Sequence, residues 1–231
     1  MAARAEQYDF GDEILRLLRA RFQIDESEFA ALKAGRSGDP FRVLVATIIS
    51  QNTNERNTFL AFERLEREIG VDPASIVAAG VKRVEEAIRV AGLQKQKAEA
   101  IVAAAELVLR DYGGDLGKLL KEGEERVRTV LGGIRGIGEK TVDVLLAFSG
   151  FPVVPVDTHV RRVAKRLGIA TGSSYEAVRE SLHRVFREEY RLEAHLLLIK
   201  LGRELCKARS PQCPACPLSK ICPSAELRGK G

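Results

Sequence analysis

Apolar residues recur every three or four positions along most of this chain, with polar residues between them. Such spacing gives a helix one apolar face and leaves its opposite face to water. It is found in segments that begin near residues 9, 40, 52, 73, 81, 96, 124, 140, 158, 173 and 196. The one hint of a strand is Val153-Val154, which is too short and is flanked by Pro152 and Pro155. The pattern therefore predicts an all-α protein.

Residues that begin or end helices stand between these segments. Asn52 with Glu55, and Ser173 with Glu176, have the spacing of a capping box at the start of a helix. Gly92 follows the predicted helix 81–91 in the position where a glycine commonly closes a helix. These residues place the predicted helix boundaries.

The positive charge of the chain is concentrated near its end. The chain has 231 residues, 45% of them hydrophobic, and a formal net charge of +5. Between Lys200 and Gly231 seven basic residues stand against Glu204 and Glu226, and seven minus two equals the whole excess. The seven are Lys200, Arg203, Lys207, Arg209, Lys220, Arg228 and Lys230. This segment predicts a phosphate-facing surface on a nucleic-acid-binding protein, and a solvated charged tail is the alternative.

The sequence gives no sign of a membrane partner. No apolar run is long enough to span a bilayer, and the first residues, MAARAEQYDF, lack the apolar region of a signal peptide. We therefore expect an intracellular, cytoplasmic protein.

A glycine turn leads directly into an apolar helix at Gly136-Ile137-Gly138. Glycines let the backbone turn tightly, and the free N–H groups at the start of the helix form an anion site. Lys140 lies in the first turn, where a cation is electrostatically disfavoured, so it should hold its proton weakly and suit a neutral amine nucleophile. An ordinary helix connection with a solvated lysine is the alternative.

Asp157 follows a link bounded by Pro152 and Pro155, which could fold it back beside Lys140. Its other interpretation is an N-cap of the helix that carries Val160 and Val163. Both roles are compatible with one carboxylate.

All four cysteines of the chain lie in one cluster, Cys206, Cys213, Cys216 and Cys222, with the spacing C-x6-C-x2-C-x5-C. Four thiolates this close predict one tetrahedral metal ion or one iron–sulfur cluster. Disulfides are the less favoured alternative in an intracellular chain. The residues alone do not separate zinc from [4Fe–4S].

Three segments of the chain together resemble the endonuclease III family of DNA glycosylases. They are Gly136-Ile137-Gly138-Glu139-Lys140-Thr141, then Val156-Asp157-Thr158-His159, and the cysteine loop 206–222. The resemblance implies a helix–hairpin–helix fold of two helical domains and a [4Fe–4S] cluster held by the four cysteines. One domain would be a continuous six-helix domain, 35–151, and the other would combine 1–34 with 152–231.

The resemblance also assigns roles to single residues. Lys140 and Asp157 would be catalytic, while Arg135, Gly136 and Gly138 would hold a DNA phosphate. Gln51 would fill the hole left by an extruded nucleotide, Leu93 would wedge into the base stack, and His159 would line the pocket. The chain departs from the family pattern at Arg135, where proline is usual, at Glu139, where a basic residue is usual, and at Asn54, where many members have aspartate.

The implied function is that of a bifunctional DNA glycosylase and AP lyase. It would remove damaged pyrimidines from double-stranded DNA through a lysine Schiff base and cut the strand by β-elimination, as a monomer. A monofunctional mismatch or adenine glycosylase is one alternative, and Lys140 argues against it because those relatives usually have Tyr or Ser there. A non-catalytic helix–hairpin–helix DNA-binding protein is the other.

Overall fold

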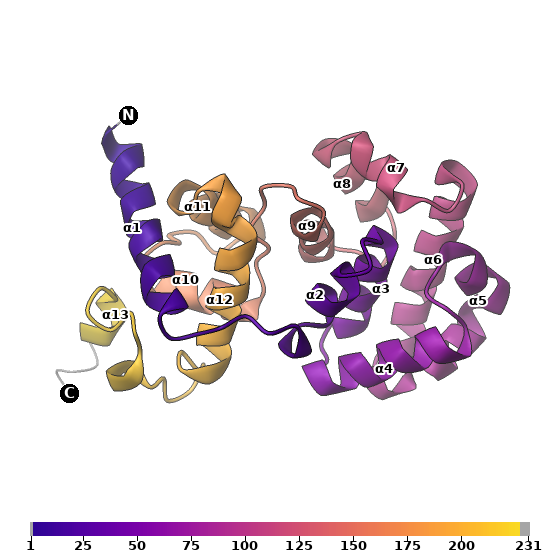
Figure 1. The fold of residues 1–231 in the computed structure, drawn as a ribbon, viewed down its shortest axis with the longest axis horizontal. Helices are drawn as coiled ribbons and strands as arrows, with labels where there is room; N and C mark the ends of the chain where they lie inside the picture. Colours follow the sequence, from indigo (N-terminus) through magenta and orange to yellow (C-terminus); the bar gives the residue numbers. More distant parts are fainter. Residues whose placement is uncertain (1, 227–231) are drawn as a thin grey trace. The chain divides into compact units, whose positions relative to one another are not determined.

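The computed structural model describes residues 2–226, and within them all regular secondary structure is helical (Figure 1). The prediction of an all-α protein is confirmed, and Val153-Val154 lies in an extended link without strand pairing. No helix of the described residues is long and apolar enough to cross a membrane.

The chain divides into two compact units. The hairpin unit is Asp25–Phe151, and the cysteine unit combines Met1–Ile24 with Pro152–Gly231. The first division falls after Ile24, whereas the sequence analysis placed it at residue 35. The difference arises because α2 (Ala30–Gly35) packs on α3 (Pro40–Ser50), which belongs to the hairpin unit.

The hairpin unit contains eight α-helices, of which α2 and α7 are short helices that the pattern did not predict. After α2 and α3 come α4 (Glu55–Glu68), α5 (Pro73–Ala87), α6 (Gln94–Tyr112), α7 (Leu116–Lys121), α8 (Glu124–Gly132) and α9 (Glu139–Phe148). Two single 3-10 turns, Glu26–Glu28 and Arg89–Ala91, complete it. Gly80 has a non-helical conformation inside α5, with φ 70° and ψ 170°, so a kink separates the two helices predicted on either side of it.

Helix α3 is the centre of the hairpin unit. Its residues from Val43 to Ile49 are all buried, and it packs against α2, α4, α6 and α9. A helix that is apolar all round is a core helix. It therefore holds on one scaffold α6, which begins directly after Leu93, and α9, whose first turn carries Lys140.

The cysteine unit is built from α1 (Ala2–Arg19), α10 (Thr158–Arg166), α11 (Tyr175–Val185) and α12 (Arg191–Glu204), followed by a short helix α13 (Pro223–Glu226). Single 3-10 turns lie at Glu188–Tyr190 and Cys213–Ala215. Figure 1 shows α1 beside α11 and α12, and the two pairs are in contact. Gly11 and Gly202 allow close approaches, because a Cβ on Gly11 would lie 2.0 Å from the Val185 carbonyl oxygen and one on Gly202 would lie 2.8 Å from the His159 Cβ.

Two predicted caps are wrong by one or two residues. Asn54, not Asn52, caps α4 by accepting from the Asn57 N–H at 2.9 Å, because Asn52 adopts a left-handed conformation with φ 51°. Glu55 instead accepts from the Ala30 N–H at 2.6 Å. Ser174, not Ser173, caps α11.

Candidate functional site

The hairpin between α8 and α9 depends on its two glycines in different ways. Gly136 has a φ of +95°, and a Cβ there would lie 3.1 Å from the Ala100 Cβ of α6. Gly138 is the N-cap of α9 with an extended backbone, and nothing lies within 4 Å of the place of its Cβ. Its carbonyl accepts from the N–H groups of Thr141 and Val142, but no side chain caps the start of α9. The first turn of α9 therefore presents N–H groups and an open approach.

Lys140 lies in this first turn and is half-buried. Within residues 25–151 its amine has no hydrogen-bond or ion-pair partner, and neither does the guanidinium of the exposed Arg135. On the neighbouring helix α8, by contrast, Glu124, Arg126 and Arg128 form ion pairs. Lys140 is therefore available for chemistry rather than engaged in the structure of its own unit.

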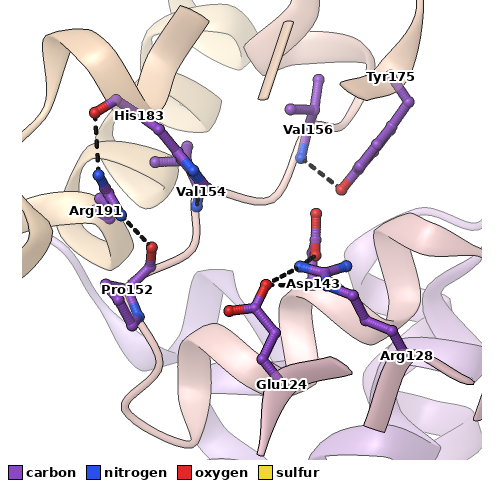
Figure 2. A network of polar contacts seen from close by, with 9 residues as sticks. All are labelled: Glu124, Arg128, Asp143, Pro152, Val154, Val156, Tyr175, His183 and Arg191. Atoms are coloured by element: carbon purple, nitrogen blue, oxygen red, sulfur yellow. Dashed lines mark hydrogen bonds and ion pairs between the residues drawn. The ribbon is translucent and has the colours of Figure 1, made fainter. Parts of the chain in front are cut away.

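A buried ion pair fastens α9 to α8. Arg128 of α8 donates to Asp143 of α9 at 2.6 Å and to Glu124 at 2.7 Å (Figure 2). Asp143 is fully buried, and the Arg128 side chain is 18% exposed. Burial alone would lower the pKa of Arg128, but the carboxylates of Asp143 and Glu124 outweigh it and raise that pKa. This ion pair thereby holds α8 and α9, the two helices on either side of the glycine turn, together.

The structure brings Gln51 to the hairpin. Its side-chain amide donates to the Gly136 carbonyl oxygen at 3.0 Å and to the Thr141 hydroxyl at 3.1 Å. Gln51 follows directly after α3, and α3 packs on α9, so the contact is a consequence of the core.

Leu93 has a conformation that local pattern does not predict. Its φ is 49° and its ψ is 29°, a left-handed conformation that is costly for a residue other than glycine, and the residue is 51% exposed. This exposure excludes a buried position for Leu93 after Gly92. An exposed leucine held in a strained conformation at the start of α6 is suited to insertion into a partner.

Asp157 is the N-cap of α10. Its Oδ1 accepts from the Val160 N–H at 2.7 Å, and the residue is half-buried. The N-cap interpretation is therefore confirmed, and the second carboxylate oxygen is left for another role. Lys140 lies in the hairpin unit and Asp157 in the cysteine unit, and their approach stays a prediction.

The link that leads to Asp157 is held by side chains from α11 and α12, which the sequence analysis missed. Arg191 donates to the Pro152 carbonyl at 2.5 Å, the Val154 N–H donates to His183 Nε2 at 3.0 Å, and the Val156 N–H donates to the Tyr175 hydroxyl at 3.2 Å (Figure 2).

A second histidine, His195 of α12, joins them, because its Nδ1 lies 2.9 Å from the Pro155 carbonyl oxygen. An extended Pro-rich link leaves its own backbone N–H and C=O groups unpaired, so it needs partners from other elements. The two histidines and the arginine on the helices that follow the link were the sequence signal for these partners.

His159 is engaged in helix packing inside the cysteine unit. Its Nδ1 lies 3.0 Å from Arg162 Nη2, and its Cβ faces Gly202 of α12. Its predicted place in a substrate pocket stays a prediction.

The four cysteines line one cavity, and none of them is in a disulfide. Burial raises the pKa of the Cys216 thiol; a backbone hydrogen bond from Leu218 opposes this, and the nearby Cys206, Cys222 and Cys213 raise it further. Among the described residues no three His, Cys, Asp or Glu side chains are grouped to hold a single metal ion.

Arg166 of α10 ties the cysteine loop to the unit. Its guanidinium lies 3.2 Å from Cys206 Sγ and donates to the Lys207 and Ala208 carbonyls at 2.7 and 3.0 Å. Lys207, Arg209 and Lys220 are exposed on this loop, while Lys200 is buried beside Glu204 and is no part of a basic surface. Arg228 and Lys230 lie outside the described residues.

Comparison with known proteins gives concordant findings. Residues 45–188 match the model of the HhH-GPD superfamily of base excision DNA repair proteins. Endonuclease III of Sulfolobus acidocaldarius is 35% identical over 218 residues, which cover 93% of this chain and 96% of the relative.

Two solved structures have the same fold at a TM-score of 0.72. A non-covalent endonuclease III–DNA complex is 30% identical and is matched over 84% of this chain and 87% of its own. A trapped endonuclease III–DNA covalent intermediate, an estranged-adenine complex, is 32% identical over 83% of this chain and 86% of its own.

Proposed function

This chain belongs to the endonuclease III family within the HhH-GPD superfamily, it is a DNA glycosylase and AP lyase of base excision repair, and we propose which of its residues perform the reaction. One observation carries the assignment. The amine of Lys140 lies in the first turn after the glycine hairpin and is free of ion pairs in its own unit. A covalent lysine intermediate requires such an uncommitted amine.

The hairpin would anchor the DNA. The uncapped N–H groups at the start of α9 suit a phosphate oxygen, and Arg135 adds a cation nearby. Phosphate contacts of this kind position the duplex without reading its sequence. Glu139, exposed at the first position of α9, replaces a basic residue of the family and should weaken this contact.

While a damaged nucleotide is stacked inside a duplex, an enzyme cannot reach its sugar C1′ atom, so the nucleotide must be extruded first. We assign the filling of the gap to Gln51 and the wedge to Leu93. Leu93 is already exposed, whereas Gln51 must exchange its bonds to Gly136 and Thr141 for bonds to DNA. Extrusion costs a few kcal/mol and is easiest for a base that pairs badly, which favours damaged pyrimidines as substrates.

The neutral amine of Lys140 then attacks the sugar C1′, a C–N bond forms, and the bond to the base breaks as the base leaves. Asp157, through the oxygen that does not cap α10, stabilises the positive charge that develops on the sugar and assists proton transfer. The ring opens to a Schiff base on Lys140. Loss of a C2′ proton and of the 3′ phosphate cuts the strand, and water releases the lysine.

We further propose that the four cysteines hold a [4Fe–4S] cluster. Their thiols line one cavity, and their spacing resembles the cluster loop of the endonuclease III family, which favours [4Fe–4S] over zinc. The cluster would supply no step of the reaction and would fix the loop with Lys207, Arg209 and Lys220 for contact with the DNA backbone. Iron analysis and a broad visible absorption band test this, and stoichiometric zinc without iron would contradict it.

Borohydride trapping on duplex DNA with an abasic site tests the catalytic assignment. Wild-type protein should be trapped covalently, and Lys140→Gln should lose both trapping and strand cleavage while it still binds DNA. Lys121→Gln is the matched control, since it removes an exposed lysine of the same unit. Asp157→Asn separates charge from capping, because asparagine caps a helix as well as aspartate does. It should keep the fold and lose most of the rate.

The monofunctional alternative makes the opposite demand. It requires base release at the wild-type rate by Lys140→Gln, with no strand cleavage by either protein.

A further inference from the structure

Lys97 is a buried lysine for which the reaction above has no use. It lies in the first turn of α6, four residues after Leu93, and only 2% of it is exposed. Burial lowers the pKa of its amine to about 8. A buried ammonium at the positive end of a helix is unfavourable on both counts, so a specific set of partners must hold it there.

Three acceptors surround the Lys97 amine. It donates to the Ile49 carbonyl at 2.8 Å, to the Thr53 hydroxyl at 2.7 Å and to the Ala91 carbonyl at 2.9 Å. An ammonium has three N–H donors and a neutral amine has two, so the protonated form matches this set.

The three acceptors come from two segments that are far apart in the sequence. Ile49 and Thr53 lie on either side of Gln51, and Ala91 lies two residues before Leu93. Thr53 adds one more link between the segments, because its hydroxyl is hydrogen-bonded to the Ala91 carbonyl; the same hydroxyl lies 3.1 Å from the Gln51 carbonyl oxygen of its own segment. One buried cation is thus hydrogen-bonded to both segments.

Both segments are also strained. Asn52 and Leu93 are two of the three non-glycine residues in the described chain that have a positive φ, with values of 51° and 49°. Such conformations persist only where the surroundings hold them, and the bonds from Lys97 and Thr53 supply this restraint.

We propose that Lys97 is a positioning residue that holds the segment with Gln51 and the segment with Leu93 together, so that both side chains enter the duplex as one rigid unit. The proposal rests on the roles assigned to Gln51 and Leu93 above. Lys97 itself touches neither the sugar nor the base. Its loss should slow invasion of a duplex and leave the bond-breaking steps unchanged.

Single-turnover cleavage of the same abasic-site oligonucleotide, as a duplex and as a single strand, separates these steps. The single strand has no stack to open. Lys97→Met keeps the length of the side chain and removes its donors, and it should cut the duplex at least tenfold more slowly while it cuts the single strand at the wild-type rate. A 2-aminopurine placed opposite the abasic site should show the same delay in its fluorescence rise. Lys95→Met is the matched control, because Lys95 is exposed in the same turn of α6.

An equal loss on both DNAs would overturn the proposal, because it would indicate general damage to the fold, and so would an unchanged duplex rate. Thr53→Val removes one acceptor of the Lys97 amine and the bond of the hydroxyl to the Ala91 carbonyl, while it keeps the buried charge. It should slow duplex cleavage severalfold with the single strand unaffected, and it decides the matter if Lys97→Met does not fold. If wild-type protein forms no borohydride adduct on either DNA, the proposed function fails rather than the positioning role.

Discussion

Replacement of Arg128 by methionine tests how the hairpin is held. The change removes a cation that lies 2.6 Å from Asp143, a carboxylate with no exposed surface. Breaking a buried ion pair from one side costs about 3–5 kcal/mol, because the remaining charge stays in a poorly solvated place. For a protein of this length each kcal/mol lowers the melting temperature by about 2–4 °C, so a fall of roughly 6–20 °C is expected.

Urea denaturation and thermal melting of two control proteins show whether burial is the cause. Arg126 lies on the same helix and forms an exposed ion pair with Glu122; the side chain of Arg126 is 57% exposed and that of Glu122 is 46% exposed. The first control, Arg126→Met, removes this pair. It should cost no more than about 1 kcal/mol. Arg128→Met combined with Asp143→Leu replaces both charges by apolar groups and should recover most of the lost stability. If Arg128→Met is no less stable than Arg126→Met, the ion pair does not hold α8 to α9.

Three further outcomes follow from the geometry. Gly138→Ala should keep the stability of the fold, because nothing lies within 4 Å of the new methyl group, and should weaken binding to every duplex alike in a salt titration; Gly136→Ala, with a φ of +95° at that position, should also lose stability. Tyr175→Phe leaves the buried Val156 N–H without its acceptor, so it should cost about 1–3 kcal/mol of stability and slow base release while DNA affinity stays unchanged. Lys97 has a pKa of about 8 in the folded chain against about 10.5 when exposed, so its protonation opposes folding fully below pH 8 and this opposition fades as the pH rises to about 10.5. The unfolding free energy of wild type relative to Lys97→Met should therefore increase by roughly 3 kcal/mol across that range, and a flat difference would show that Lys97 has an ordinary pKa.

The helices and several of their ends are determined locally. Apolar spacing, an N-cap and a closing glycine act over one or two helical turns, so residues close in sequence are enough to predict them. The all-α class, the cap at Asp157 and the grouping of four cysteines in one loop were available in this way. The caps at Asn52 and Ser173 were wrong because several polar residues stand side by side there, and the choice among them depends on the path of the incoming chain.

The working parts of the site were decided by packing between distant segments. Gln51 meets Gly136 across 85 positions of the chain, and Lys97 meets Ile49 across 48. Tyr175, His183 and Arg191 hold the link before Asp157 from helices that follow it. The spacing of apolar residues predicts which face of each helix is buried. The hydrogen-bond partner of each polar group depends on which helices pack together. The strained conformation of Leu93 and the burial of Lys97 exist only because α3 and α6 are brought together in the folded core.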